Sequence, residues 1–210
     1  DAEDREIAIA KTSIEEEVAG ASIMPAGVTE KLTRRELVDL VRFLSELGKV
    51  GKFAVGRESV VRRWRVMNDT ADARFRLRRT SYQSASEDDP AYIWSPAYSK
   101  VDGSLPLSDI PELRIRNRVA AGSKGVGFVR CELDVTTPGK VALVLKDASA
   151  LKLWLDGRPI ETAEQTVLDL SRGLHRLTIT VDLAARKQPL RVAIEAVPNS
   201  QARVQVVGGK

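Results

Sequence analysis

Two stretches of this chain differ in the spacing of their apolar residues, and each spacing predicts a different kind of structure. Between residues 33 and 47, apolar side chains recur three and four positions apart, at Leu37, Leu40, Val41, Leu44 and Leu47. That spacing places them together on one face of an α-helix.

The ends of this helix are also indicated. Thr33 and Glu36 have the spacing of a capping box, in which each side chain accepts a hydrogen bond from the other residue's backbone N–H. Gly48 follows the last apolar position, and glycine tolerates the left-handed conformation that ends many helices. We therefore expect a helix over residues 33–47.

From residue 60 onward, apolar and polar residues alternate, which predicts β-strands. The alternation is partial over 60–66 and 74–78, and residues 80–123 are irregular. Asp156-Gly157 separates two alternating runs and predicts a hairpin with a type I′ turn. Further strands are expected over 126–135, 140–147, 150–155, 158–161, 166–170, 174–182, 189–197 and 202–207. Many short strands with regular turns predict a mainly β fold with a small α segment, namely an antiparallel β-sandwich or jelly roll.

These patterns divide the chain into three parts. Residues 1–50 carry the helix, residues 51–59 form a linker with glycines, and residues 60–210 form the β-sandwich module. The acidic start, Asp1 to Arg5, has no initiator methionine and no apolar stretch, so it is not a signal peptide. We therefore expect the chain to be either a piece cut from a larger chain or a protein with a processed terminus.

Composition and charge narrow the function classes. No apolar run approaches the roughly 20 residues needed to span a bilayer. The net charge is +4, and eight arginines lie within residues 57–80. They indicate solvated strand faces or, alternatively, docking on an acidic redox protein or anionic polysaccharide. Nucleic-acid binding is not expected, because the aromatic residues are not interleaved as a base-stacking surface requires.

The residue types that carry most catalytic chemistry are scarce. The single cysteine, Cys131, lies in an alternating run and is expected to be a small buried hydrophobe. The single histidine, His175, follows a glycine turn and is expected to be structural. The acidic run Glu87-Asp88-Asp89 indicates a solvated loop or, alternatively, a calcium site. No nucleophile–base pair or acid–base pair can be named, so we do not expect an enzyme.

Aromatic residues gather in the irregular stretch. Tyr82, Tyr92, Trp94 and Tyr98 lie among polar residues and prolines. Such rings can bind glycans through the apolar C–H face of a pyranose, which makes Tyr92, Trp94 and Tyr98 candidate glycan-binding residues. The alternative is that they close one end of the sandwich core.

The most specific feature is Ser22-Ile23-Met24-Pro25-Ala26-Gly27, followed by the capped helix. Together with Asp4 to Lys11 and Ile14 to Glu16, it resembles the C-terminal part of a haem-binding cytochrome c domain found in large secreted proteins of planctomycetes and related bacteria. The resemblance covers about a quarter of the chain. It implies that Met24 is the distal axial ligand of a haem iron, where a thioether raises the reduction potential.

The same resemblance implies the cofactor, the partners and the location. The cofactor is haem c, but the Cys-x-x-Cys-His attachment motif is absent from this chain. The haem would therefore be carried by an upstream domain or a partner chain, in a periplasmic or secreted electron-transfer protein that takes electrons from a dehydrogenase.

Residues 60–210 are similar to β-sandwich modules appended to such proteins and to bacterial glycosidases, notably over 150–157 and 173–182. The expected function is the tail of an extracytoplasmic c-type cytochrome with a module for binding or positioning. The alternative is a non-enzymatic carbohydrate-binding module whose residues 1–50 are a haem-free adaptor.

Overall fold

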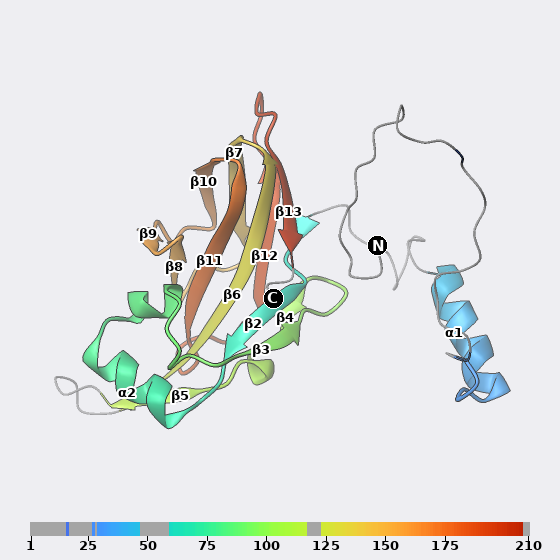
Figure 1. Cartoon of the computed structure of the whole chain (residues 1–210), viewed down its shortest axis with the longest axis horizontal. Coiled ribbons are helices and arrows are strands. Elements are labelled where there is room, and N and C mark those ends of the chain that lie inside the picture. Colours follow the sequence, from blue (N-terminus) through green and yellow to red (C-terminus); the bar gives the residue numbers. More distant parts are fainter. Residues whose placement is uncertain (1–15, 17–26, 28, 47–58, 117–122, 208–210) are drawn as a thin grey trace. The chain divides into compact units, whose positions relative to one another are not determined.

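A computed structural model describes residues 16, 27, 29–46, 59–116 and 123–207 (Figure 1). The chain divides into two units, Asp1–Ala54 and Val55–Lys210, which are treated separately below. Met24 and the run over residues 5–11 lie outside the described residues.

In the first unit, the helix expected over 33–47 is confirmed as α1 (Arg34–Glu46). Its capping box is formed: the Thr33 backbone N–H donates to Glu36 Oε2 at 2.8 Å, and the Glu36 N–H donates to Thr33 Oγ1 at 3.3 Å. These bonds satisfy N–H groups that a helix start would otherwise leave without partners.

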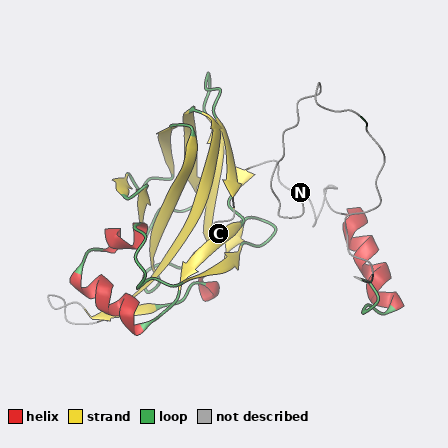
Figure 2. Ribbon diagram, viewed as in Figure 1, coloured by secondary structure: helices red, strands yellow, loops and turns green. Residues whose placement is uncertain are grey.

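The second unit consists of two antiparallel sheets packed as a sandwich, as the alternating pattern predicts (Figure 2). The strand order of the smaller, five-stranded sheet is β1-β12-β7-β10, with β4 also paired to β12. Its strands are β1 (Ser59–Val60), β4 (Ser104–Leu105), β7 (Gly139–Leu145), β10 (Gln165–Leu170) and β12 (Leu190–Ala196).

The larger, eight-stranded sheet has the order β3-β2-β6-β11-β8-β9, and β5 and β13 also pair with β6. Its strands are β2 (Arg63–Met67), β3 (Trp94–Tyr98), β5 (Leu113–Arg116), β6 (Ser123–Thr137), β8 (Leu151–Leu155), β9 (Arg158–Ile160), β11 (Gly173–Asp182) and β13 (Arg203–Val207). The expected hairpin joins β8 to β9, with Asp156 at a φ of 49° and Gly157 at 79°.

The long strand β6 separates two cores because its side chains alternate between its two faces. Val129, Cys131 and Leu133 point into the sandwich, where the inner faces of both sheets meet. Val126 and Phe128 point outward into a second, smaller core. That second core is covered by α2 (Ala71–Arg79) and the 3-10 helix η2 (Tyr82–Ser86), which Figure 2 shows together at one end of the strands.

The strand expected over 74–78 is wrong, because these residues belong to α2. Thr70 caps this helix by accepting a hydrogen bond from the Ala73 N–H, and Asp72 lies in the first turn, where the helix dipole favours negative charge. Ala73 and Leu77, four residues apart, are the buried positions. The alternation of arginine with Phe75 and Leu77 resembled a strand only because Phe75 is apolar yet half exposed.

The irregular stretch 80–123 also contains ordered elements. Besides η2 and β3, it holds β4, the 3-10 helix η3 (Leu107–Asp109) and β5. These segments are too short to show a periodicity in the sequence. Pairing with β12 holds β4 in place, and pairing with β6 holds β5 in place.

Replacing a side chain in the sandwich core should cost far more stability than the same change on the surface. Leu177 is fully buried on β11, whereas Leu174 on the same strand is 59% exposed. We expect Leu177→Ala to lower the free energy of unfolding by about 2–5 kcal/mol, and Leu174→Ala by no more than about 0.5 kcal/mol. Urea denaturation measures both, and equal losses would contradict this placement of the core.

Candidate functional site

The three candidate glycan-binding aromatics lie in different surroundings. Tyr92 is 5% exposed and belongs to the second core, where its hydroxyl lies 2.6 Å from Ser84 Oγ. Trp94 is partly buried against the same core. Tyr98 is 64% exposed. Tyr92 therefore stabilises the fold from inside, and Tyr98 is the ring that solvent reaches most freely.

Trp94 carries an arginine on its ring. The guanidinium carbon of Arg130 lies 4.2 Å from the ring centroid, a distance typical of a cation–π contact. Arg130 comes from β6, where it lies opposite Arg65 of β2 and Thr178 of β11. The ring thus positions a charged group on the outer face of the larger sheet.

Arg130 is an incompletely neutralised buried cation. Its side chain is 13% exposed, and its Nη1 lies 3.6 Å from Asp88 Oδ1. Nη1 has no hydrogen-bond partner among the described residues. Burial, and then the nearby charge of Arg176, lower the pKa of Arg130 to about 10. Loss of hydration and repulsion between like charges both disfavour the charged guanidinium.

Asp88 is shared between two arginines. Its Oδ1 accepts a hydrogen bond from Arg176 Nη1 at 2.8 Å, although the Asp88 side chain is 74% exposed. Its neighbour Asp89 accepts from Arg76 Nε at 2.7 Å. The acidic run Glu87-Asp88-Asp89 therefore holds its loop against arginines of α2 and β11.

His175 lies beside this network, at a pocket of about 460 Å³ that is also lined by Asp88, Asp156 and Arg176. Its Nδ1 lies 2.6 Å from Asp156 Oδ2, and its Nε2 lies 2.8 Å from the Ser171 carbonyl oxygen. Both partners are acceptors, so the arrangement favours the imidazolium, whose two N–H groups can donate at once. Burial alone would lower the pKa of His175, but these bonds outweigh it and raise the pKa above its ordinary value.

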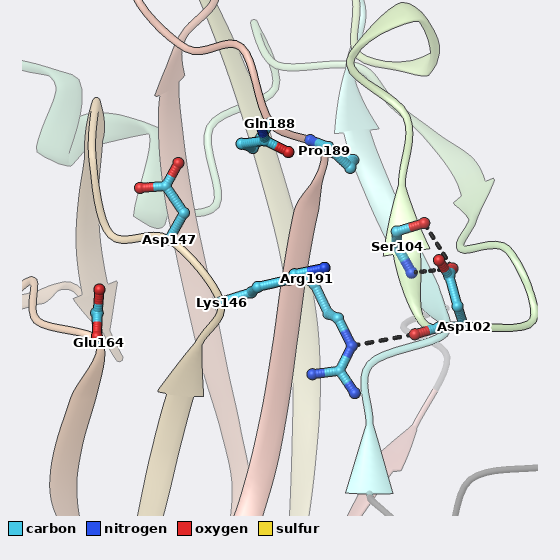
Figure 3. A pocket seen from close by; sticks show the side chains of 8 residues that line it. All are labelled: Asp102, Ser104, Lys146, Asp147, Glu164, Gln188, Pro189 and Arg191. Atoms are coloured by element: carbon cyan, nitrogen blue, oxygen red, sulfur yellow. Dashed lines mark hydrogen bonds between the residues drawn. The ribbon is translucent and has the colours of Figure 1, made fainter.

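A second cleft, of about 900 Å³, lies at the smaller sheet. Figure 3 shows Asp102 and Ser104 on one side, Asp147 and Glu164 on the other, and Arg191 between them. The full lining is Asp102, Ser104, Lys146, Asp147, Glu164, Gln188, Pro189 and Arg191.

Local structure fixes the walls of this cleft. Gly103 has a φ of 80° and lies so close to Val60 that a Cβ would come within 2.8 Å of its side chain, so only glycine suits this turn. Arg191 Nε donates to the Asp102 carbonyl oxygen at 3.0 Å. On the other wall, the fully buried Arg186 donates to the carbonyl oxygens of Asp147 and Ser149.

The carboxylates of the cleft are suited to accepting hydrogen bonds. Bonds from the Ser104 hydroxyl and N–H, together with nearby lysines, lower the pKa of Asp102. Bonds from Ser149 and the charge of Arg186 lower the pKa of Asp147. A general acid at neutral pH needs a raised pKa. Asp102 and Asp147 are therefore poorly suited to act as general acids at neutral pH.

Among the residues that the structure describes, no group of three or more histidine, cysteine or acidic side chains is placed to hold a metal ion. No helix of the described ranges is long and apolar enough to cross a membrane. Comparisons with protein-family profiles, curated proteins and solved structures found no match. The site is therefore interpreted from its own chemistry.

Neither the arginine network nor the cleft is visible in the amino-acid sequence. Asp88 and Arg176 are 88 positions apart, and only the fold brings them together. The Asp156-Gly157 turn was the one local sequence signal near the network, because Asp156 also contacts His175.

The raised pKa of His175 predicts a pH-dependent stability. The fold favours the charged ring, so this contribution is complete below the unfolded pKa of about 6.5 and is lost as pH rises through the higher folded value. We expect the free energy of unfolding to fall over that range in the unaltered protein and to lose this slope in His175→Gln. Urea titrations between about pH 5.5 and 8.5 test this, and an unchanged slope in the variant would assign it to another group.

Proposed function

We propose that this chain is the terminal part of an extracytoplasmic c-type cytochrome joined to a β-sandwich of jelly-roll type. In this proposal Met24 is the distal ligand of the haem iron, and α1 packs within the cytochrome fold. The sandwich positions the redox domain on a partner protein or a glycan, and the protein works in the periplasm or after secretion.

The observation that carries the proposal is the apolar face of α1. Leu37, Leu40, Val41 and Leu44 are between 37% and 58% exposed, and no residue of α1 is buried by the described part of the chain. Fully covering one such side chain stabilises a fold by about 1.5–3 kcal/mol. A well-capped helix with this face is suited to pack against further structure, as the last helix of a cytochrome domain does.

Two described side chains bear on where the proposed haem would be attached. Cys131 is buried in the sandwich core, and burial raises the pKa of its thiol. His175 engages Asp156 and Ser171 through its two ring nitrogens. Neither Cys131 nor His175 is available to attach or ligate a haem, so we assign the attachment to an upstream segment or partner chain. Met24 is then the one ligand that this chain would supply.

Replacing Met24 tests this assignment in the full-length, haem-containing protein. A thioether ligand raises the reduction potential of haem iron, so we expect Met24→Ala to lower the potential and to remove the methionine–iron charge-transfer band. Spectroelectrochemical titration measures both. The matched control is Met67→Leu, which alters the other methionine, a residue of the second core. An unchanged potential in Met24→Ala would reject Met24 as a ligand.

A second candidate is a carbohydrate-binding module with a haem-free adaptor in residues 1–50. The exposed ring of Tyr98 favours this alternative. A pyridine haemochrome spectrum and an intact mass of the protein from its native source separate the two. A c-type spectrum on a polypeptide much heavier than 23.0 kDa supports the cytochrome, and a haem-free chain of 23.0 kDa supports the module.

A further inference from the structure

His175 connects two turns of the sandwich. One is the Asp156-Gly157 turn between β8 and β9. The other covers residues 171–173 and joins β10 of the smaller sheet to β11 of the larger sheet. The ring contacts Asp156 Oδ2 through Nδ1 and the Ser171 carbonyl oxygen through Nε2. Because the side chain is only 12% exposed, water competes little for either ring nitrogen.

The β8–β9 turn is also held by bonds that do not involve the ring. Asp156 Oδ1 accepts a hydrogen bond from the Arg176 N–H at 2.7 Å, and the Asp156 N–H donates to the Arg176 carbonyl oxygen at 2.9 Å. The Gln83 side chain of η2 donates to the Gly157 carbonyl oxygen at 2.9 Å. This turn therefore keeps its place on β11 whether or not the ring is charged.

The turn over 171–173 depends more on the ring. Ser171 and Arg172 are exposed, and a Cβ added to Gly173 would meet nothing within 4 Å. Among the described residues, His175 is the one side chain that hydrogen-bonds Ser171, with its Nε2 lying 2.8 Å from the carbonyl oxygen. The Ser171 hydroxyl is farther away, at 3.4 Å from the same nitrogen.

The carboxylate in contact with the ring is that of Asp156. The other charged groups that line the adjoining pocket are Glu87, Asp88, Glu132 and Arg176. Arg176 engages Asp88 at 2.8 Å and Glu132 at 3.7 Å. Burial disfavours the charged ring, but the bonds to Asp156 and Ser171, with the charge of Asp156, hold the pKa of His175 above its ordinary value.

We propose that His175 is a pH-dependent latch, in which the imidazolium ties the 171–173 turn to the β8–β9 turn and loss of its proton releases the 171–173 turn. A neutral imidazole has one N–H and one lone pair. The proton stays on Nδ1, because a hydrogen bond to a carboxylate is stronger than one to a carbonyl group. The lone pair of Nε2 then faces the Ser171 carbonyl oxygen, and the two acceptors repel each other. The Ser171 hydroxyl can replace this bond only if the turn shifts.

The latch acts at a connection between the two sheets. β10 is the last strand in the order of the smaller sheet, and the 171–173 turn leads from its end into the larger sheet. The latch is closed below the unfolded pKa of about 6.5 and opens as pH rises through the higher folded value. This opening is local, unlike the change in global stability predicted above, and it is independent of the haem assignment.

Trypsin cleavage after Arg172 measures the release, because a protease cuts a folded chain where it opens locally. The full chain is digested briefly at pH values between about 6 and 9, and mass spectrometry quantifies the product that ends at Arg172. A free peptide of residues 168–176 in the same tube corrects for the pH dependence of trypsin. Relative to this peptide, we expect cleavage to rise about fivefold as the ring loses its proton, which corresponds to the loss of one hydrogen bond.

Asp156→Asn is the matched variant. Asparagine tolerates the φ of 49° at this position, and its carbonyl oxygen can keep the bond from the Arg176 N–H, which leaves its NH₂ group facing Nδ1. A neutral ring then accepts at Nδ1 and donates through Nε2 to Ser171, so both contacts form without a charge. We expect slow cleavage after Arg172 at every pH in this variant, and fast cleavage at every pH in His175→Ala.

Two further measurements separate the latch from other effects. Nitrogen-15 NMR of the imidazole reports its protons directly, and the signal is unambiguous because His175 is the one histidine of the sequence. We expect both ring nitrogens to be protonated at low pH and Nδ1 alone at high pH. Cleavage after Arg130, in the middle of β6, reports global unfolding and should not follow the cleavage after Arg172.

Four results would overturn the latch while leaving the Met24 assignment to its own test. The first is a titrating ring with no change in cleavage after Arg172, and the second is a ring that keeps one protonation state throughout the range. The third is an equal rise in the unaltered protein and in Asp156→Asn, which would assign the opening to another group. The fourth is a parallel rise after Arg130, which would indicate that the whole sandwich loosens.

Discussion

The sandwich depends on the antiparallel ladder between β6 and β11. β6 is 15 residues long, pairs with β11 on one edge, and pairs with β2, β5 and β13 on the other. Side chains on a strand alternate between its two faces, so a shift of one residue in this ladder would exchange Cys131 and Leu133 with Arg130 and Glu132. The cost of burying those charges fixes the register, and the register sets which residues face outward.

The outer surface of this ladder carries an apolar region and a largely buried charge side by side. At one end, Phe128 is covered by the second core, and Tyr82 packs edge-on against it with ring centroids 5.5 Å apart. Two residues further along the same face of β6, Arg130 Nη1 has no hydrogen-bond acceptor within the part of the chain that the structure describes. Burying a cation without complete pairing is unfavourable, so this position contributes less to stability than an apolar residue of similar size would.

Much of the architecture is visible in the sequence, because it follows from local patterns. The alternating runs from residue 126 onward predict the strands within a few residues, and the Thr33–Glu36 spacing predicts the start of α1. The sequence misled at α2, where apolar Phe75 is half exposed. The arginine network was hidden for a different reason. Asp88 lies far from both Arg130 and Arg176 in the chain, and a periodicity carries no information about which loop meets which strand.

The position of Cys131 makes the chain an internal reporter of its own opening. The thiol is 3% exposed in the middle of the β6–β11 ladder, and it is the one cysteine of the sequence. Thiolate is the reactive form of cysteine, and both burial and the raised pKa suppress it in the native state. A maleimide or disulfide reagent would therefore modify this chain only when the two sheets separate. The rate of that modification would measure the opening of the sandwich without any introduced cysteine.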